Sequence, residues 1–332
     1  MKIHFLVQGF RVAASRYRVF QYIPYLKEHG IETTFGLYPR NPVEMMRFLG
    51  NLPKYDCLFL QRKRFSGALL SLVRRRARKI IYYIEDSLMY RNSTSKFPHS
   101  RTLLKRFADM VKASDYVIAG NRFLMEQTLP FTQQVDVIPT AIDADRYIPK
   151  DYTIKKARVN LGWIGDHGSI HYMEKMKPIF ETIGRRYPKA ELSIVCDTFI
   201  DCRDIPIIRK VWSHETEIKD LRDMDIGLMP LMNDLWSEGK CGLKILQYFG
   251  IAVPAVCTPV GVNKDVVKDG TTGFYANDPD EWVEKLSILI ENPDLRRQMG
   301  EKGREIVMNG YTIQACAPKL LQIIQKTVGN EK

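Results

Sequence analysis

Lys240 and Lys244, set among glycines, give this sequence its clearest binding chemistry. Gly239 and Gly242 permit close approach of a ligand to the backbone, and residues 241–249 have helical spacing. The two lysines share one face of this expected helix, close to its start. A lysine there opposes the helix dipole unless an anion is shared between the ammonium and the free backbone N–H groups. The pattern predicts either an anion-binding helix start or two solvated lysines on a surface helix.

The same helix is expected to have an apolar face against the core and a polar face toward a ligand. Leu243, Leu246 and Phe249 recur with helical spacing and are the expected core residues. Gln247 shares the polar face with the lysines. Gly250 stands where a helix C-cap favours a residue without Cβ.

A second glycine turn follows a short apolar segment. Residues 252–257 predict a buried strand, and Gly261, Val262 and Asn263 form the turn after it. Backbone N–H groups in such a turn can form a second nest for an anion.

Alternating strands and helices must position these groups. In the first half of the chain, the expected strands are 2–7, 31–37, 56–60 and 79–84, and the expected helices are 11–29, 42–51 and 66–78. In the second half, the expected strands are 159–164, 191–195, 209–212, 226–229 and 252–257. Both the alternation and the length of 332 residues predict two α/β domains, each with a parallel sheet.

The turn after the first strand contains candidate ligand contacts. Gly9 lies in the turn, and Arg16 and Arg18 lie where the chain enters the next helix. Open α/β sheets bind ligands at this end of their strands. The two arginines fit either a grip on an anionic donor or acceptor, or an ion pair on a solvated helix face.

Two adjacent carboxylates follow the strand at 79–84. Glu85 and Asp86 are expected to project from the carboxyl edge of the sheet, where catalytic groups gather. We expect Asp86 to contact the reacting groups. The alternative is that the Asp86-Ser87 pair is a helix N-cap. In the second half, Gly165, Asp166 and His167 form another glycine turn after a strand, and such a turn suits a diphosphate.

Positive charge is concentrated in the first half of the chain. Residues 1–150 hold 25 Lys and Arg against 12 Asp and Glu, a net +13, whereas residues 151–332 hold 25 against 26, a net −1. The expected helix at 66–78 carries Arg74, Arg75 and Arg76, and it fits either a membrane-surface helix or a solvated face. No nucleic-acid-binding signature accompanies the charge, so we expect no nucleic-acid partner.

Metal ligands and disulfides are not expected. The Asp143-x-Asp145 and Asp223-x-Asp225 pairs are interpreted as structural, and the six cysteines as reduced, buried thiols. The sequence starts directly with a strand pattern and shows no spanning helix or signal peptide, which predicts a cytoplasmic protein.

Several motifs together resemble glycosyltransferase family 4, the glycosyl transferases of group 1. They are Gly-x-x-Gly-Leu-Lys-x-Leu-Gln-Tyr at 239–248, Pro-Ala-Val at 254–256, Pro-Val-Gly-Val-Asn at 259–263 and Asp-Gly-x-x-Gly-Phe at 269–274. The resemblance extends over nearly the whole chain. It implies the GT-B fold, with two facing Rossmann-like domains. Residues 1–150 would form the acceptor side and residues 151–311 the donor side, with a last helix at 312–330 crossing back to the first domain.

The resemblance also implies a reaction. A retaining, metal-independent enzyme would transfer a sugar from a nucleotide-diphosphate sugar to a glycan or lipid-linked acceptor, in the synthesis of a cell-surface polysaccharide or glycoconjugate, without a further cofactor. Lys240, Lys244 and the turn amides would stabilise the leaving diphosphate. Ser213 and Glu215 are implied contacts of the nucleotide base.

This chain departs from the family at several donor and acceptor positions. Two glutamates usually stand at the positions of Gly239 and Gln247. Glu238 is a neighbouring substitute for the first, and the amide of Gln247 can still bind a ribose. Glu85 stands where many members carry histidine.

The departures leave two other functions open. One is a non-catalytic scaffold of the same fold in a polysaccharide assembly complex, and the other is a sugar-nucleotide epimerase of GT-B architecture. For an enzyme, the basic first half favours an anionic acceptor or one presented at the inner face of a membrane, to which the protein would bind peripherally.

Overall fold

The computed structural model describes residues 1–154 and 156–329, and it contains two compact units. The first unit consists of Met1–Ala141, Asp234–Cys241 and Ile313–Lys332, and the second of Ile142–Asn233 and Gly242–Thr312. The first unit therefore ends at Ala141 rather than at residue 150, and it includes a short segment from the second half of the sequence. Residue 330, the last of the expected crossing helix, lies outside the described residues.

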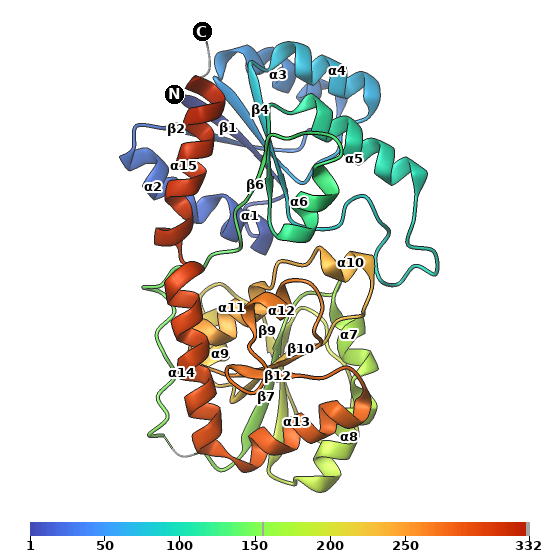
Figure 1. The fold of residues 1–332 in the computed structure, drawn as a ribbon, viewed down its shortest axis with the longest axis vertical. Coiled ribbons are helices and arrows are strands. Elements are labelled where there is room, and N and C mark those ends of the chain that lie inside the picture. The colour runs from blue at the N-terminus through green and yellow to red at the C-terminus, as the bar shows by residue number, and fades with distance from the viewer. Residues whose placement is uncertain (155, 330–332) are drawn as a thin grey trace. The chain divides into compact units, whose positions relative to one another are not determined.

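The first unit is an α/β layer structure (Figure 1). Its elements are β1 (Lys2–Val7), α1 (Ala13–Arg18), η1 (Phe20–Tyr22), α2 (Ile23–Glu28), β2 (Glu32–Leu37), α3 (Pro42–Asn51), η2 (Leu52–Lys54), β3 (Cys57–Gln61), α4 (Gly67–Arg76), β4 (Lys79–Ile84), α5 (Arg101–Ala113), β5 (Tyr116–Ala119), α6 (Arg122–Thr128), β6 (Val135–Val137), α10 (Leu235–Glu238) and α15 (Ile313–Gly329).

The sheet of the first unit is parallel and buried on both faces. Alternate residues of β1 point to opposite faces, so that Phe5 joins a core with η1, α2 and α15 while Leu6 joins a core with α3, α4 and α5. The strand order is β2-β1-β3-β4-β5-β6. The chain winds outward from β1 to β2 and then returns to β3, which places a topological switch point at the carboxyl ends of β1 and β3.

The second unit repeats this architecture. Its elements are β7 (Val159–Ile164), α7 (Ile170–Lys175), α8 (Lys177–Arg186), β8 (Ala190–Cys196), β9 (Ile207–Val211), α9 (Glu217–Arg222), β10 (Ile226–Met229), α11 (Leu243–Gly250), β11 (Ala255–Cys257), α12 (Val262–Val266), β12 (Gly273–Tyr275), α13 (Pro279–Glu291) and α14 (Pro293–Gly310). The parallel strand order β12-β11-β10-β7-β8-β9 places a switch point between β7 and β10.

The expected α/β class with parallel sheets is confirmed, but several helices and strands differ from their predicted extents. The helix expected at 11–29 is divided into α1, η1 and α2, and the strand expected at 252–257 is limited to Ala255–Cys257. Proline explains part of this, because Pro254 has no N–H to give to a strand ladder.

The segment around Lys240 also differs from its prediction. Helix α11 begins at Leu243, after Gly242 in a left-handed conformation with φ of 67°, so that Lys240 lies outside the helix. At the other end, Gly250 is the last helical residue and Ala252, with φ of 60°, takes the left-handed position expected of Gly250. A Cβ on Gly250 would lie 2.4 Å from Ile142 Cδ1, so glycine is needed there for packing rather than for a cap.

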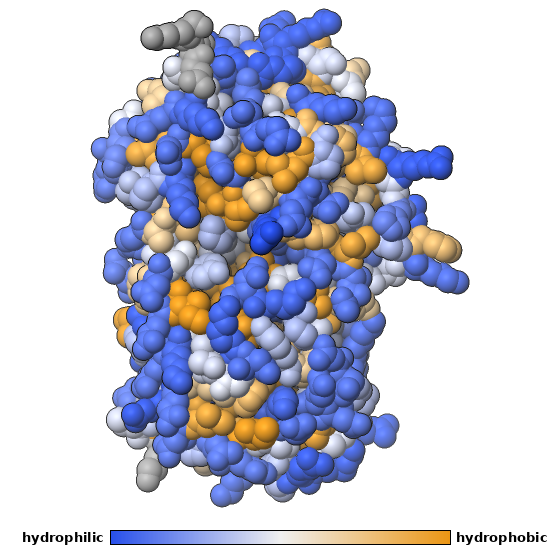
Figure 2. Space-filling model, viewed as in Figure 1, coloured by the Kyte–Doolittle hydropathy of each residue, from blue (hydrophilic) through white to orange (hydrophobic). Residues whose placement is uncertain are grey.

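Among residues 1–154 and 156–329, we find no helix with the length and apolar character required to span a bilayer. The face of the molecule shown in Figure 2 is mostly hydrophilic, with apolar side chains gathered in separate patches.

Candidate functional site

The switch point of the second sheet is organised by the indole of Trp163. Trp163 is the penultimate residue of β7 and only 1% exposed. A Cβ on Gly165 would lie 2.2 Å from this ring, so only glycine lets the turn after β7 cross the indole. The Lys244 ammonium lies over the same ring, 5.4 Å from its centroid. One buried side chain therefore brings together the Gly165 turn and the first turn of α11.

Helix α11 presents positive potential at this place. Its first helical residues follow the left-handed Gly242, and the described residues of its first turn include no acidic side chain. The N-terminal N–H groups carry the positive end of the helix dipole, and Lys244 adds a formal charge. Without an anion, these two effects oppose each other.

The glycine turn after β11 adjoins the start of α11. A Cβ on Gly242 would lie 2.9 Å from Val262 Cγ1, so the two helix starts are in contact. Gly261 has φ of 53°, and the buried Asn263 holds the turn by donating from Nδ2 to the carbonyl of Thr258 at 2.9 Å. The side chain of Asn263 thus shapes the turn, and its backbone N–H donates to the carbonyl of Val260 at 3.2 Å. The N–H groups of Gly261 and Val262 are the candidates to face an anion.

The remaining predicted donor residues follow β7 and β9 at the same edge of the sheet. Asp166 and His167 are exposed on the turn after β7, where His167 Nδ1 lies 2.7 Å from Asp197 Oδ2. This hydrogen bond raises the pKa of His167. Ser213 Oγ accepts from the backbone N–H of Thr216 at 3.2 Å, and Glu215 is exposed beside it.

Gln247 does not present an exposed polar tip. It is 3% exposed, and its Nε2 donates to Tyr147 Oη at 3.1 Å within the second unit. Leu246 and Phe249 are buried as expected, and Leu243 is half-buried. The predicted polar face of this helix is therefore limited to its first turn.

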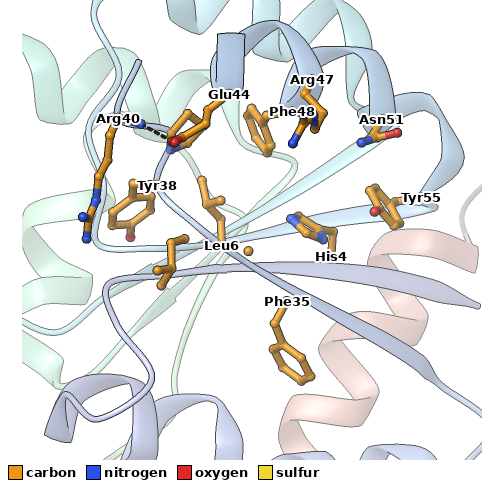
Figure 3. A pocket seen from close by; sticks show the side chains of 13 residues that line it. His4, Leu6, Phe35, Tyr38, Arg40, Glu44, Arg47, Phe48, Asn51 and Tyr55 are labelled. Carbon is orange, nitrogen blue, oxygen red and sulfur yellow. Dashed lines mark hydrogen bonds between the residues drawn. The ribbon is translucent and has the colours of Figure 1, made fainter. Parts of the chain in front are cut away.

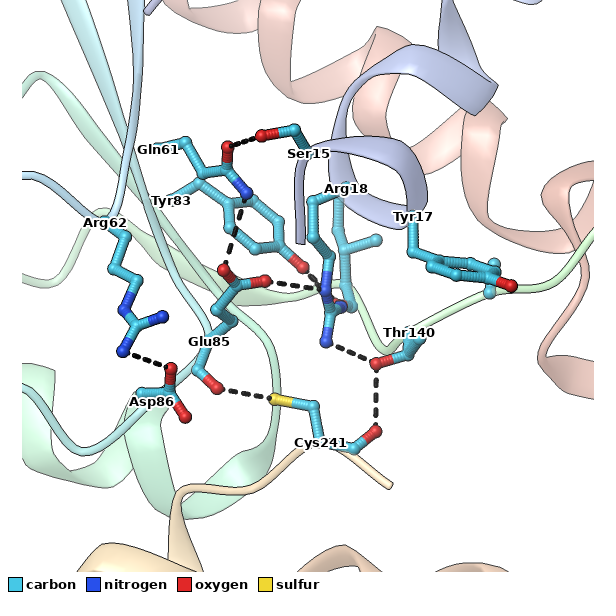
Figure 4. Close-up of polar contacts among 12 residues, drawn as sticks. Ser15, Tyr17, Arg18, Gln61, Arg62, Tyr83, Glu85, Asp86, Thr140 and Cys241 are labelled. Atoms are coloured by element: carbon cyan, nitrogen blue, oxygen red, sulfur yellow. Dashed lines mark hydrogen bonds and ion pairs between the residues drawn. The ribbon is translucent and has the colours of Figure 1, made fainter. Parts of the chain in front are cut away.

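In the first unit, Asp86 is held between two cations. Its Oδ2 lies 2.9 Å from Arg62 Nη2, and its Oδ1 accepts from Lys240 Nζ at 2.9 Å (Figure 4 shows the Arg62 pair). Burial raises the pKa of Asp86, but the charges of Lys240 and Arg62 outweigh burial, and its pKa lies below the ordinary 3.8. Asp86 is therefore an ionised carboxylate. It is not a helix N-cap, because the next helix after β4 begins at Arg101.

Arg62 was not predicted. It follows β3 directly and adopts the left-handed conformation, with φ of 61°. Such backbone is uncommon outside glycine and is typical of functional turns. The signals of it in the sequence are its place in the basic run 62–64 and its position directly after a buried strand, beside the strand that ends at Ile84.

Glu85, the residue before Asp86, forms a buried ion pair with Arg18. Arg18 Nε lies 3.1 Å from Glu85 Oε2, and both side chains are less than 10% exposed, at 5% and 8%. The guanidinium also donates to Tyr83 Oη and Thr140 Oγ1 (Figure 4). Burial raises the pKa of Glu85, and Arg18 opposes this without cancelling it. Arg18 thus positions the end of β4, and it is not on a solvated helix face.

The other predicted arginine and the first glycine turn lie nearer the surface. Arg16 is half-buried, with its guanidinium carbon 5.0 Å from the Tyr17 ring centroid. Gly9 is half-buried in the turn after β1, where a Cβ would lie 3.0 Å from Val12 Cγ2.

The segment Asp234–Cys241 is fastened to the first unit by backbone contacts. Asn121 Nδ2 donates to the carbonyls of Glu238 and Lys240, each at 3.1 Å. A Cβ on Gly239 would lie 2.2 Å from Ser87 Oγ. Glycine at the position of the usual glutamate is thus required for close packing against the Asp86-Ser87 turn, and this packing places Lys240 on Asp86.

Comparison with known proteins now identifies part of the chain. The family described as Glycosyl transferases group 1 matches residues 204–292, which include α11, α12 and the turns at their starts. Residues 204–292 are thus similar to the group 1 glycosyltransferases. The resemblance predicted from the motifs is confirmed.

Curated relatives match different shares of the chain. Trehalose synthase of Pyrococcus horikoshii is 31% identical over 88 residues, 26% of this chain and 21% of that protein. N-acetyl-alpha-D-glucosaminyl L-malate synthase of Bacillus anthracis is 20% identical over 100% of this chain and 91% of its own length. The chain spans about a fifth of the length of the first two curated relatives it matches, 21% and 20%.

Solved structures establish the fold. Sucrose-phosphate synthase from Thermosynechococcus elongatus superposes with a TM-score of 0.76 and 13% identity, over 98% of both chains. Anabaena HepE in complex with UDP and glucose gives a TM-score of 0.71 at 13% identity, over 98% of this chain and 100% of that one. The predicted GT-B fold is confirmed.

A double-mutant cycle tests the Asp86–Lys240 pair. Asp86→Asn and Lys240→Met should each lower the free energy of unfolding, with a coupling energy of about 1 kcal/mol at pH 7, because each removes the other's partner. The coupling should fade as the pH drops below 3.8, because the lowered pKa of Asp86 makes its stabilisation present above that value and lost below it.

Lys63→Met is the matched control for this cycle. Lys63 follows Arg62 but its ammonium lies over the Tyr38 ring, 5.1 Å from the centroid. Urea unfolding of the three single variants and two double variants gives both couplings. Equal coupling of Asp86 to Lys63 and to Lys240 would show that the Asp86–Lys240 ion pair does not form in solution.

Proposed function

We propose that this protein is a retaining, metal-independent glycosyltransferase that moves a sugar from a nucleotide-diphosphate sugar to a glycan or lipid-linked acceptor. A role in the synthesis of a cell-surface polysaccharide or glycoconjugate is part of the proposal. The observation that carries it is the convergence at Trp163 of the Gly165 turn and the Lys244 end of α11. This arrangement lies at the switch point of a parallel sheet, where α/β proteins bind nucleotides.

The donor diphosphate would be bound by the second unit. The N–H groups of the first turn of α11, the Lys244 ammonium and the turn at Gly261–Asn263 form one positive surface that suits a diphosphate. Ser213 and Glu215, after β9, are the proposed contacts of the base. Gln247 is the proposed contact of the ribose, and such a contact requires its buried side chain, which donates to Tyr147, to be rearranged.

The proposed reaction breaks the bond between the anomeric carbon and a diphosphate oxygen, and forms one between that carbon and an acceptor hydroxyl oxygen. The proton of the acceptor hydroxyl passes to the leaving diphosphate, on which negative charge develops as its bond to the anomeric carbon breaks. Lys244 and the helix-start amides meet this developing charge, which stabilises the transition state more than the bound donor.

The acceptor would be bound by the first unit. Asp86 is ionised, and its carboxylate can accept a hydrogen bond from a hydroxyl while Arg62 and Lys240 hold it in place. Lys240 is therefore proposed to act beside Asp86. Arg18 is proposed to position the end of β4 through its ion pair with Glu85. Arg16 remains a proposed contact for an anionic group of the substrate.

Other proteins make a UDP sugar the first donor to test. HepE has been crystallised with UDP-glucose, and the Bacillus anthracis relative is named as a glucosaminyl synthase. A non-catalytic scaffold and a GT-B epimerase are the competing functions. The fit of Gly165 and Lys244 around one ring favours a working donor site over a scaffold.

The basic first unit suggests a peripheral position on the inner, anionic face of a membrane. Arg75 and Arg76 on α4 are exposed, whereas Arg74 is bound to Asp115 at 2.7 Å. The exposed pair is thus the part of this cluster able to meet lipid headgroups. We propose a cytoplasmic protein that reaches lipid-linked acceptors through this surface.

Lys244→Ala tests the donor site. Calorimetric titration with UDP and other nucleotide diphosphates should show selective binding to the native protein, weakened about tenfold or more in the variant because a charge-assisted contact is lost. Lys189→Ala is the matched control, since this exposed lysine precedes β8 at the opposite edge of the sheet. Absence of binding by the native protein across the panel would favour the scaffold function, and turnover of a UDP sugar without acceptor would favour the epimerase.

Charge reversal of Arg75 and Arg76 tests the membrane surface. Arg75→Glu/Arg76→Glu should reduce sedimentation with phosphatidylglycerol vesicles, because each cation near an anionic surface contributes roughly 1 kcal/mol. Lys189→Glu/Lys302→Glu changes the net charge equally with exposed residues of the second unit. Equal losses in the two double variants would assign binding to net charge alone and contradict this surface.

A further inference from the structure

A groove with a volume of about 610 Å³ lies between α3 and the edge strand β2 of the first unit (Figure 3). Its walls are largely aromatic and its rim carries arginines. The residues used below are His4, Tyr38, Arg40, Arg47, Phe48 and Tyr55. None of them belongs to the Asp86 network.

The floor of the groove is built from fixed polar and aromatic groups. His4 is 8% exposed, its Nδ1 lies 2.9 Å from Thr34 Oγ1, and its ring stacks on Tyr55 with centroids 4.7 Å apart. A Cβ on Gly36 would lie 2.7 Å from His4 Nε2, so the glycine in β2 leaves the space that the groove occupies. Burial lowers the pKa of His4 to about 4, and the ring is therefore neutral at pH 7.

The rim of the groove is positive. Arg40 and Arg47 are exposed, and the acidic residue between them, Glu44, is engaged at the start of α3. Its carboxylate accepts from the backbone N–H of Arg40 at 2.8 Å and from Asn41 Nδ2 at 2.9 Å. The guanidinium groups are thus available for an anion, and arginine suits the planar geometry of carboxylates and phosphates.

One end of the groove approaches the proposed acceptor residues. Lys63 lies over the Tyr38 ring, 5.1 Å from its centroid, and Lys63 follows Arg62, which pairs with Asp86. Tyr38, which lines the groove, follows the carboxyl end of β2, and Asp86 follows the carboxyl end of β4 in the same parallel sheet. A ligand in the groove would therefore be bound by the same unit as a group at Asp86.

We propose that this groove binds an acidic glycan segment, the part of the acceptor that does not react. Sugar rings would pack against Tyr55 and Phe48, a carboxylate or phosphate on the sugar would bind Arg47, and hydroxyl groups would meet His4 Nε2. Pockets with aromatic walls and a few placed polar groups bind ring-shaped small molecules of this kind. The proposal rests on the proposed function, since it names the substrate class of the acceptor side.

Titration of the full chain with a tetrasaccharide of alternating glucuronate and N-acetylglucosamine tests the proposal. The native protein should bind it more tightly than the neutral N-acetylglucosamine tetramer, and Arg47→Gln should weaken binding about tenfold. Tyr55→Ala should weaken both oligosaccharides, because it removes the stacking surface. Arg76→Gln removes an exposed arginine on α4 and is the control for charge.

The outcomes separate this groove from the donor site. UDP titration of the same proteins reports on the proposed function, and Arg47→Gln should leave it unchanged. If UDP binds but the acidic tetrasaccharide does not, the groove proposal is overturned while the transferase proposal stands. Equal weakening by Arg47→Gln and Arg76→Gln would also overturn it, since general electrostatic attraction would then explain the binding.

Discussion

The close approach of backbone and ammonium to the Trp163 indole is the constraint on which the second unit depends. The ring leaves no room for a Cβ at residue 165, and the same ring lies beneath the Lys244 ammonium. The turn after β7 and the start of α11 are therefore set by one buried group, which the strand order places at the switch point. The position of this positive surface is thus set by buried packing, and charge held in place in this way is the form of electrostatics that contributes most to catalysis.

The first unit depends on a different feature, a carboxylate that stays ionised while it is buried. Asp86 is 6% exposed, and Arg62 and Lys240 together overcome the cost of its desolvation. Lys240 belongs to a segment from the second half of the sequence, Asp234–Cys241. Asn121 holds this segment by donating hydrogen bonds from Nδ2 to two of the segment's backbone carbonyls. Loss of the usual glutamate at residue 239 is then a packing requirement, because Ser87 leaves no space for a side chain there.

The sequence predicted the fold well because both sheets are parallel and buried, and such strands are apolar runs that alternate with helices. It predicted Asp86, Gly165 and Lys244 at strand or helix ends for the same reason. It was wrong about where this helix begins, because helical spacing continues from Cys241 through Gly242 while the backbone turns left-handed at Gly242 and the helix starts at Leu243. The sequence did not predict long-range partners. Arg62 pairs with Asp86, and Tyr147 with Gln247, through contacts between distant segments that local patterns do not encode.

Hydrogen exchange measured by mass spectrometry, with and without UDP, tests the central claim most directly. The account predicts that UDP slows amide exchange in two peptides, one spanning the turn at 163–170 and the other the start of α11 at 242–247, because these N–H groups would bind the diphosphate. Slowed exchange elsewhere with no change in these two segments would contradict the assignment of the donor site to the residues around Trp163.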